Sequence, residues 1–175
     1  MALEICDIRF SEGGLGGLVS VTKNLDNRTL TTTKTEAGER EIDLAPELAE
    51  MLKMYIGTRT SGFVFRTRSA GPVLQRNVLR MLHVILERMG HSKLGFHAFR
   101  RFRVTHLRKN MVPEDIIKFW IGHSPKTVTD EYSKVKNDVR FRREVTEKVG
   151  LGFTLKSEMF PVVPQFSSAE SLQSV

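Results

Sequence analysis

The sequence predicts an α+β fold that is mostly helical and has a small antiparallel sheet near its N-terminus. In the first third of the chain, short segments rich in Val, Leu and Thr are separated by turn-type residues. From Pro46 onward, apolar residues recur at helical spacing and are bounded by residues typical of helix ends. A length of 175 residues suits one compact domain.

Three strands are expected, over Leu18–Thr22, Thr29–Thr33 and Arg40–Leu44. Asn24–Arg28 has the composition of the turn between the first two. Lys34–Glu39 should connect the last two as a hairpin, in which Gly38 can take a positive φ. Lys34 is therefore expected at or near the hairpin tip.

Helices are expected over Pro46–Tyr55, Val73–Met89, His97–Lys109, Pro113–Ile121 and Asp138–Val149. Gly122 is a typical C-terminal stop. Ser124 and Pro125 then supply an N-cap and a first-turn proline for a further helix that carries Tyr132.

Cys6 is the one cysteine, which excludes an intrachain disulfide and a thiolate metal cluster. Its apolar neighbours in Leu3–Ile8 predict a buried side chain. No apolar run approaches the ~20 residues that span a bilayer. Acidic and basic residues interrupt any signal-peptide core near the N-terminus. The single cysteine fits a reducing cytoplasm, where the protein is expected.

The charge lies in one part of the chain. The net charge is +7, which favours an anionic partner such as nucleic acid or an acidic membrane surface, although a basic soluble protein without such a partner fits equally. Residues 1–150 form the expected domain. Residues 151–175 carry only three charged residues and are expected to be a flexible tail or a docking arm.

The expected helix at 97–109 is strongly basic. His97 and Arg100 lie three residues apart on one face, and no acidic residue occurs in this stretch. Its further basic residues include Arg101, Arg103, Arg108 and Lys109. Two interpretations stay open, a solvated basic face and a phosphate site, for which the guanidinium fork is well shaped.

Two more polar residues follow. His123 stands between two expected helices, at an N-terminus that suits an anion, or it makes a local hydrogen bond at the helix end. Tyr132 comes nine residues later. It shares a helical stripe with Val128 and Val135, so a core aromatic is the simpler interpretation of that residue alone.

The order of these residues resembles the tyrosine recombinases, the phage-integrase-type enzymes. The similar stretches are Thr33-Lys34-Thr35 with Gly38 and Arg40, HAFRRFRVTHL at 97–107, and IGHSPKTVTDEYSKV at 121–135. The resemblance covers about residues 3–135 and is most specific in the last stretch.

The resemblance implies the catalytic-domain fold of that family and a phosphoryl transfer without metal or cofactor. Tyr132 would attack a DNA phosphodiester and form a 3′-phosphotyrosyl bond. Arg100 would hold the phosphate, His123 would donate to a non-bridging oxygen, Lys34 would protonate the leaving 5′ oxygen, and His97 would assist proton transfer. Arg101, Arg103 and Lys134 are expected to contact DNA. The partners implied are double-stranded DNA and three further protomers in a tetrameric synapse, in the cytoplasm at the nucleoid. In such an assembly the arm at residues 151–175 would dock on a neighbouring protomer.

The family also uses an arginine ahead of the strand that resembles Leu3–Ile8. By that alignment it would fall about ten residues before Leu3, so the sequence predicts a catalytic domain truncated before its first helices. Loss of one preorganised donor typically lowers a rate by ~10²–10³. Two functions therefore stay open, an active recombinase and an inactive DNA-binding remnant or fragment.

Overall fold

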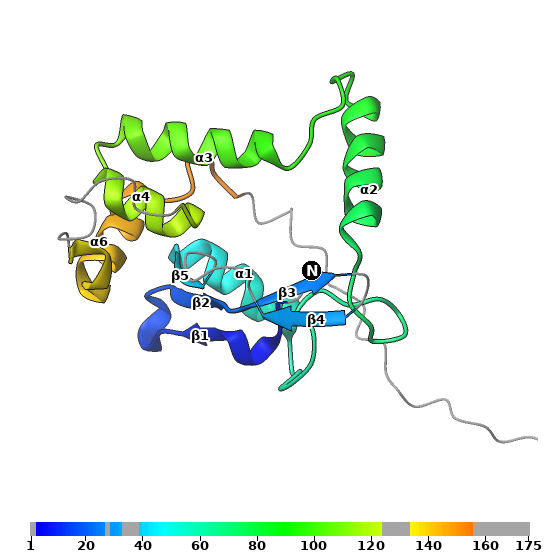
Figure 1. Ribbon diagram of the computed structural model, residues 1–175, viewed down its shortest axis with the longest axis horizontal. Helices are drawn as coiled ribbons and strands as arrows, with labels where there is room; N and C mark the ends of the chain where they lie inside the picture. Colours follow the sequence, from blue (N-terminus) through cyan, green and yellow to red (C-terminus); the bar gives the residue numbers. More distant parts are fainter. Residues whose placement is uncertain (1–2, 27–28, 33–38, 124–133, 156–175) are drawn as a thin grey trace, which may run out of the picture.

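The computed structural model describes residues 3–26, 29–32, 39–123 and 134–155 (Figure 1). This part of the chain is α+β, as predicted, with a small antiparallel sheet near the N-terminus. The strands are β1 (Ile8–Phe10), β2 (Gly17–Val21), β3 (Lys23–Asp26), β4 (Thr29–Thr32) and β5 (Arg40–Leu44). The helices are α1 (Pro46–Ile56), α2 (Gln75–Arg88), α3 (His97–Lys109), α4 (Glu114–Ile121) and α6 (Val139–Val149), with a short 3₁₀ turn, η4 (Val135–Asn137), before α6.

The strands form two antiparallel groups. The main sheet has the order β1-β2-β5, and Val19 of β2 faces both Ile8 and Ile42. β3 and β4 form a separate pair. The turn predicted over Asn24–Arg28 is wrong for Asn24–Asp26, because these residues belong to β3 and Asp26 pairs with Thr29. Asn and Asp favour turns, but cross-strand pairing in a ribbon overrides this weak local preference.

The prediction of a buried Cys6 is also wrong. Cys6 is exposed and lies in a 3₁₀ turn, Ile5–Asp7. Before this turn, Glu4 forms a bridge with Phe63, and the Val64 amide donates to the Leu3 carbonyl. The backbone is therefore not extended between Glu4 and Ile8. In this turn the alternation of inward and outward side chains, which holds in a strand, does not decide which residues face the core.

Two hydrophobic clusters lie on either side of β5. One joins the main sheet to α1 and contains the buried residues Ile8, Val19, Leu44, Ala49, Leu52, Ile56 and Val64. The other joins α3 and α4 and contains Leu107, Val112, Ile116, Ile117 and Trp120, with α6 residues packed against it. Both α4 and α6 contact β5, so this strand connects the two clusters.

The predicted helices are confirmed within the described residues, with ends that differ by at most two residues. Figure 1 shows α3 above the sheet and α2 standing to one side, and α2 contains no buried residue. The hairpin expected between Thr29–Thr33 and Arg40–Leu44 is wrong, because β4 pairs with β3 and β5 pairs with β2, in separate sheets. Lys34 itself, the helix expected to carry Tyr132, and residues 156–175 lie outside the described residues. No helix in the described ranges has the length and apolar character needed to cross a membrane.

Candidate active site

The first catalytic candidates lie at the start of α3. His97 is the first residue of this helix and Arg100 follows after about one turn, and both side chains are exposed. A guanidinium Nη2 of Arg100 donates to the carbonyl oxygen of Ile121 at 2.7 Å. Arg100 therefore reaches the last residue of α4, and α3 and the end of α4 form one site.

The end of α4 delivers His123 to that site. Gly122 adopts the left-handed conformation, with φ 69° and ψ 42°. The Gly122 amide donates to Phe119 at 3.1 Å and the His123 amide donates to Lys118 at 3.0 Å, which closes the helix in the manner of a Schellman motif. The exposed His123 thus follows directly after the carbonyl that Arg100 binds.

Arg40 completes the arrangement from the side of the sheet. Its Nε donates to the carbonyl oxygen of Trp120 at 3.1 Å. Burial and the nearby charge of Arg100 both lower the pKa of Arg40, so the two guanidinium groups are close enough to repel. In the sequence, Arg40 stands out only as part of the stretch around Lys34 that resembles the recombinases, because nothing in its local pattern distinguishes it from an ordinary strand-end arginine.

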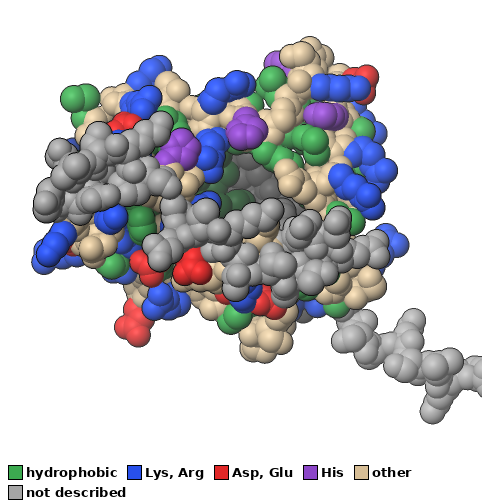
Figure 2. Space-filling view, in the orientation of Figure 1, with side chains coloured by type: hydrophobic (Ala, Val, Ile, Leu, Met, Phe, Trp, Pro, Cys, Tyr) green, Lys and Arg blue, Asp and Glu red, His purple; other side chains and the backbone are tan. Residues whose placement is uncertain are grey.

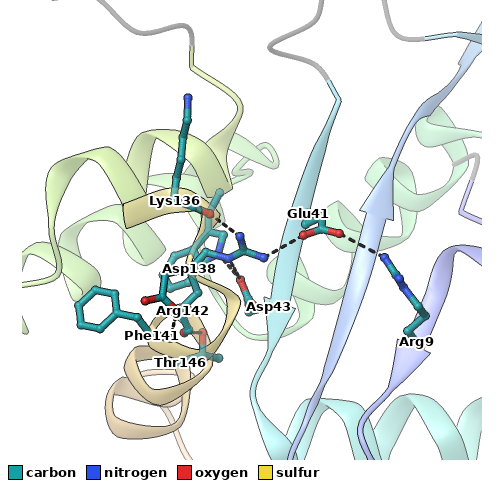
Figure 3. Close-up of polar contacts among 9 residues, drawn as sticks. Arg9, Glu41, Asp43, Lys136, Asp138, Phe141, Arg142 and Thr146 are labelled. Atoms are coloured by element: carbon teal, nitrogen blue, oxygen red, sulfur yellow. Dashed lines mark hydrogen bonds and ion pairs between the residues drawn. The ribbon is translucent and has the colours of Figure 1, made fainter. Parts of the chain in front are cut away.

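A buried ionic network, the Arg142 network, lies beside this site (Figure 3). Arg142 of α6 is 2% exposed, and its Nε and Nη2 donate to Asp43 at 2.8 Å and to Glu41 at 2.9 Å. Its Nη1 donates to the carbonyl of Lys136. The indole Nε1 of Trp120 also donates to Asp43, at 2.8 Å. These contacts join β5, α4, η4 and α6. The sequence does not reveal them, because the residues that they join are up to about a hundred positions apart.

Comparison with known families identifies the chain. A model described as the phage integrase family matches residues 4–138, which is more than three quarters of the sequence. The chain belongs to the phage integrase family. A search of curated proteins and a search of solved structures each found no match. Members of this family generally break and rejoin DNA.

The matched span contains every residue that the resemblance assigned to catalysis. The structure of this integrase-family domain joins Arg100 to Ile121, two residues before His123, and His97 lies one turn from Arg100. Lys34 and Tyr132 lie outside the described residues. Figure 2 shows Lys and Arg side chains gathered over α2 and α3, with histidines among them.

The three residues of the integrase domain that are expected to contact DNA differ in their exposure to solvent. Arg101 and Lys134 are exposed. Arg103 is partly buried and donates to the carbonyl of Gly150 at 2.5 Å, so it links α3 to the end of α6, and burial lowers its pKa. Its contact with DNA stays a prediction.

One cluster in the described part of the chain has the donor types of a metal site. Glu4, Cys6 and Asp7 offer ligand atoms within 4.8 Å of one another. The ammonium group of Lys23 forms ion pairs with both carboxylates, which raise its pKa. A cation therefore already balances this cluster, which we interpret as structural.

Gly122→Ala should destabilise the integrase domain by about 1–3 kcal/mol, because a non-glycine residue at positive φ is strained. The new Cβ would also lie 2.9 Å from a guanidinium nitrogen of Arg40. Gly90→Ala is the matched control, because Gly90 has φ +73° but open space where its Cβ would be. Urea unfolding should show the larger loss at Gly122, and equal losses would mean that the Arg40 contact contributes nothing.

Proposed function

We propose that this chain is the catalytic domain of a site-specific tyrosine recombinase that cleaves and rejoins DNA through a 3′-phosphotyrosyl intermediate. The observation that carries the proposal is the convergence of Arg100 and the Gly122–His123 turn, which come from separate helices and meet through the 2.7 Å contact to Ile121. Membership of the phage integrase family supports the same reaction class.

The chemistry requires fixed positive charge and hydrogen-bond donors around one phosphate. The transition state spreads negative charge over the equatorial oxygens, and preorganised donors stabilise it. Arg100 has five N–H donors and uses one group on Ile121, so the rest of its fork can bind a phosphate. His123 is exposed beside it and can donate to a non-bridging oxygen.

The proposed reaction has two steps, cleavage by Tyr132 and rejoining to a second strand. The Tyr132 hydroxyl oxygen bonds to phosphorus and the bond to the 5′ oxygen breaks, with His97 assisting removal of the phenolic proton and Lys34 protonating the leaving oxygen. A 5′ hydroxyl of a second strand then attacks the phosphotyrosine and releases Tyr132. The phosphotyrosyl bond conserves the energy of the cleaved diester, so no high-energy cofactor is needed.

A nicked suicide substrate tests this function. The nick lets a short fragment leave after cleavage, so the covalent complex accumulates and is seen on a denaturing gel. A mixed-sequence duplex library supplies the target. We expect a protein–DNA band that protease removes. Retained DNA binding without a band at high protein concentration would instead support an inactive DNA-binding remnant.

Arg101→Ala should weaken DNA binding while leaving cleavage at saturating DNA unchanged. The exposed Arg101 follows Arg100 on α3. If it neutralises one phosphate, the slope of log K against log salt should decrease by about 1. Arg9→Ala is the control, because it removes the same charge from β1, where the side chain is 70% exposed. An identical salt slope in both variants and the wild type would exclude Arg101 from the DNA interface.

A further inference from the structure

Trp120 is attached to β5 by both its main chain and its side chain. Its carbonyl oxygen accepts a hydrogen bond from Arg40 Nε at 3.1 Å, and its indole Nε1 donates to Asp43 at 2.8 Å. Trp120 itself is 8% exposed. The residue three positions before His123 is therefore held to the edge strand of the main sheet at two separate points.

The Arg40 guanidinium also occupies the space beside Gly122. Three of its atoms, Nη1, Cζ and Nε, lie 2.9, 3.1 and 3.2 Å from the position that a Cβ of Gly122 would take. Two features thus favour glycine here, its positive φ and this close approach. The turn that leads into His123 rests directly on Arg40.

Two arginines therefore hold successive carbonyls at one helix end. Arg40 binds the carbonyl of Trp120 from the sheet, and Arg100 binds that of Ile121 from α3. Terminal carbonyls of a helix carry partial negative charge, which favours cations there. Contacts from two different elements restrict the direction in which Gly122 and His123 leave α4 far more than one contact would.

We propose that Arg40 is a positioning residue, which holds the end of α4 so that His123 and Arg100 face the same phosphate. The proposal rests on the proposed recombinase function. Arg40 acts through the Trp120 carbonyl and the Gly122 backbone, and it does not itself bind DNA. A displacement of about 1 Å at a reacting group can lower a rate by ~10²-fold, so the loss of this contact should be visible in the cleavage rate.

The first measurement compares Arg40→Ala with Arg9→Ala, which removes the same charge from the same sheet. Single-turnover cleavage of a suicide substrate and DNA affinity are measured separately. We expect Arg40→Ala to cleave about 10²-fold more slowly with unchanged affinity, and added guanidinium ion to restore part of the rate. Arg9→Ala should behave as the wild type. A parallel loss of affinity and salt slope would overturn the proposal, because it would show that Arg40 binds phosphate directly.

The second measurement does not depend on activity. The amides of Gly122 and His123 donate within the turn, so their hydrogen exchange reports its order. In Arg40→Ala we expect their exchange to be roughly five- to tenfold faster, the change that the loss of one ordinary hydrogen bond implies. The amides of Leu107 and Ile116 should be unchanged.

The two measurements separate the two proposals. Unchanged exchange at Gly122 and His123, or an equal rise at every amide, would overturn the positioning role of Arg40. If the wild-type chain forms no adduct, the recombinase function fails, while faster exchange confined to the turn would still show that Arg40 orders it.

Discussion

Tyr132→Phe should leave no covalent protein–DNA adduct on a nicked substrate and should keep the DNA affinity of the wild type. Phenylalanine lacks the phenolic oxygen that would bond to phosphorus in the proposed reaction, so the first chemical step of that reaction would have no nucleophile. The groups that we expect to bind the phosphate, Arg100 and His123, are untouched. The measurement is a denaturing gel for the adduct, with a binding assay on the same DNA.

Tyr55→Phe is the matched control, because the chain contains two tyrosines. Tyr55 lies in α1, where its ring packs against Phe65 with centroids 5.4 Å apart. This variant should form the adduct normally. An adduct that survives Tyr132→Phe would assign the nucleophile to another residue, and one lost only in Tyr55→Phe would assign it to α1.

Arg142→Ala should lower the free energy of unfolding by about 3–5 kcal/mol, because removing one partner of a buried ion pair leaves the other charge uncompensated. Arg142 is 2% exposed and the side chain of its partner Asp43 is 5% exposed. The substitution also removes the donor to the Lys136 carbonyl and the contact of the guanidinium with the Phe119 ring, 4.9 Å from its centroid. For a domain of this size we expect the melting temperature to fall by roughly 10 °C.

Arg140→Ala separates charge from burial in the same helix. Arg140 lies two residues before Arg142 in α6, its side chain is 90% exposed, and it pairs with Glu144 across one turn. Exposed pairs of this kind contribute about 0.3–0.5 kcal/mol. Calorimetry should therefore detect little change. A similar loss in both variants would mean that the buried Arg142 network is no more stabilising than a surface pair.

Arg100 on α3 and His123 after α4 illustrate what local sequence can predict. Apolar periodicity and end signals predicted α3 and α4, with α3 starting at His97 and α4 stopping at Gly122. These local features place His97 and Arg100 on one face and put His123 just after a helix. They do not say that the two helices meet, because the 2.7 Å contact from Arg100 to Ile121 joins residues 21 positions apart.

The errors have the same origin. Asn24–Asp26, which were expected in a turn, form part of β3 because pairing with β4 decided their backbone. Cys6, expected to be buried, is exposed because contacts of its neighbours with the Phe63–Val64 segment redirect the chain. In both places pairing with another segment of the chain outweighed a local preference of about 1 kcal/mol or less.

The sequence by itself determined the fold class, the five described helices, the glycine stop at Gly122 and the resemblance to a recombinase family. These depend on spacing within one segment or on the order of a few residues along the chain. Only the tertiary structure decided that the Arg40 guanidinium lies beside Gly122 and that Trp120 and Arg142 both donate hydrogen bonds to Asp43. It also decided that α4 and α6 both contact β5. Such contacts depend on how elements pack in space, and no local pattern specifies which distant residue will satisfy a buried charge or a helix end.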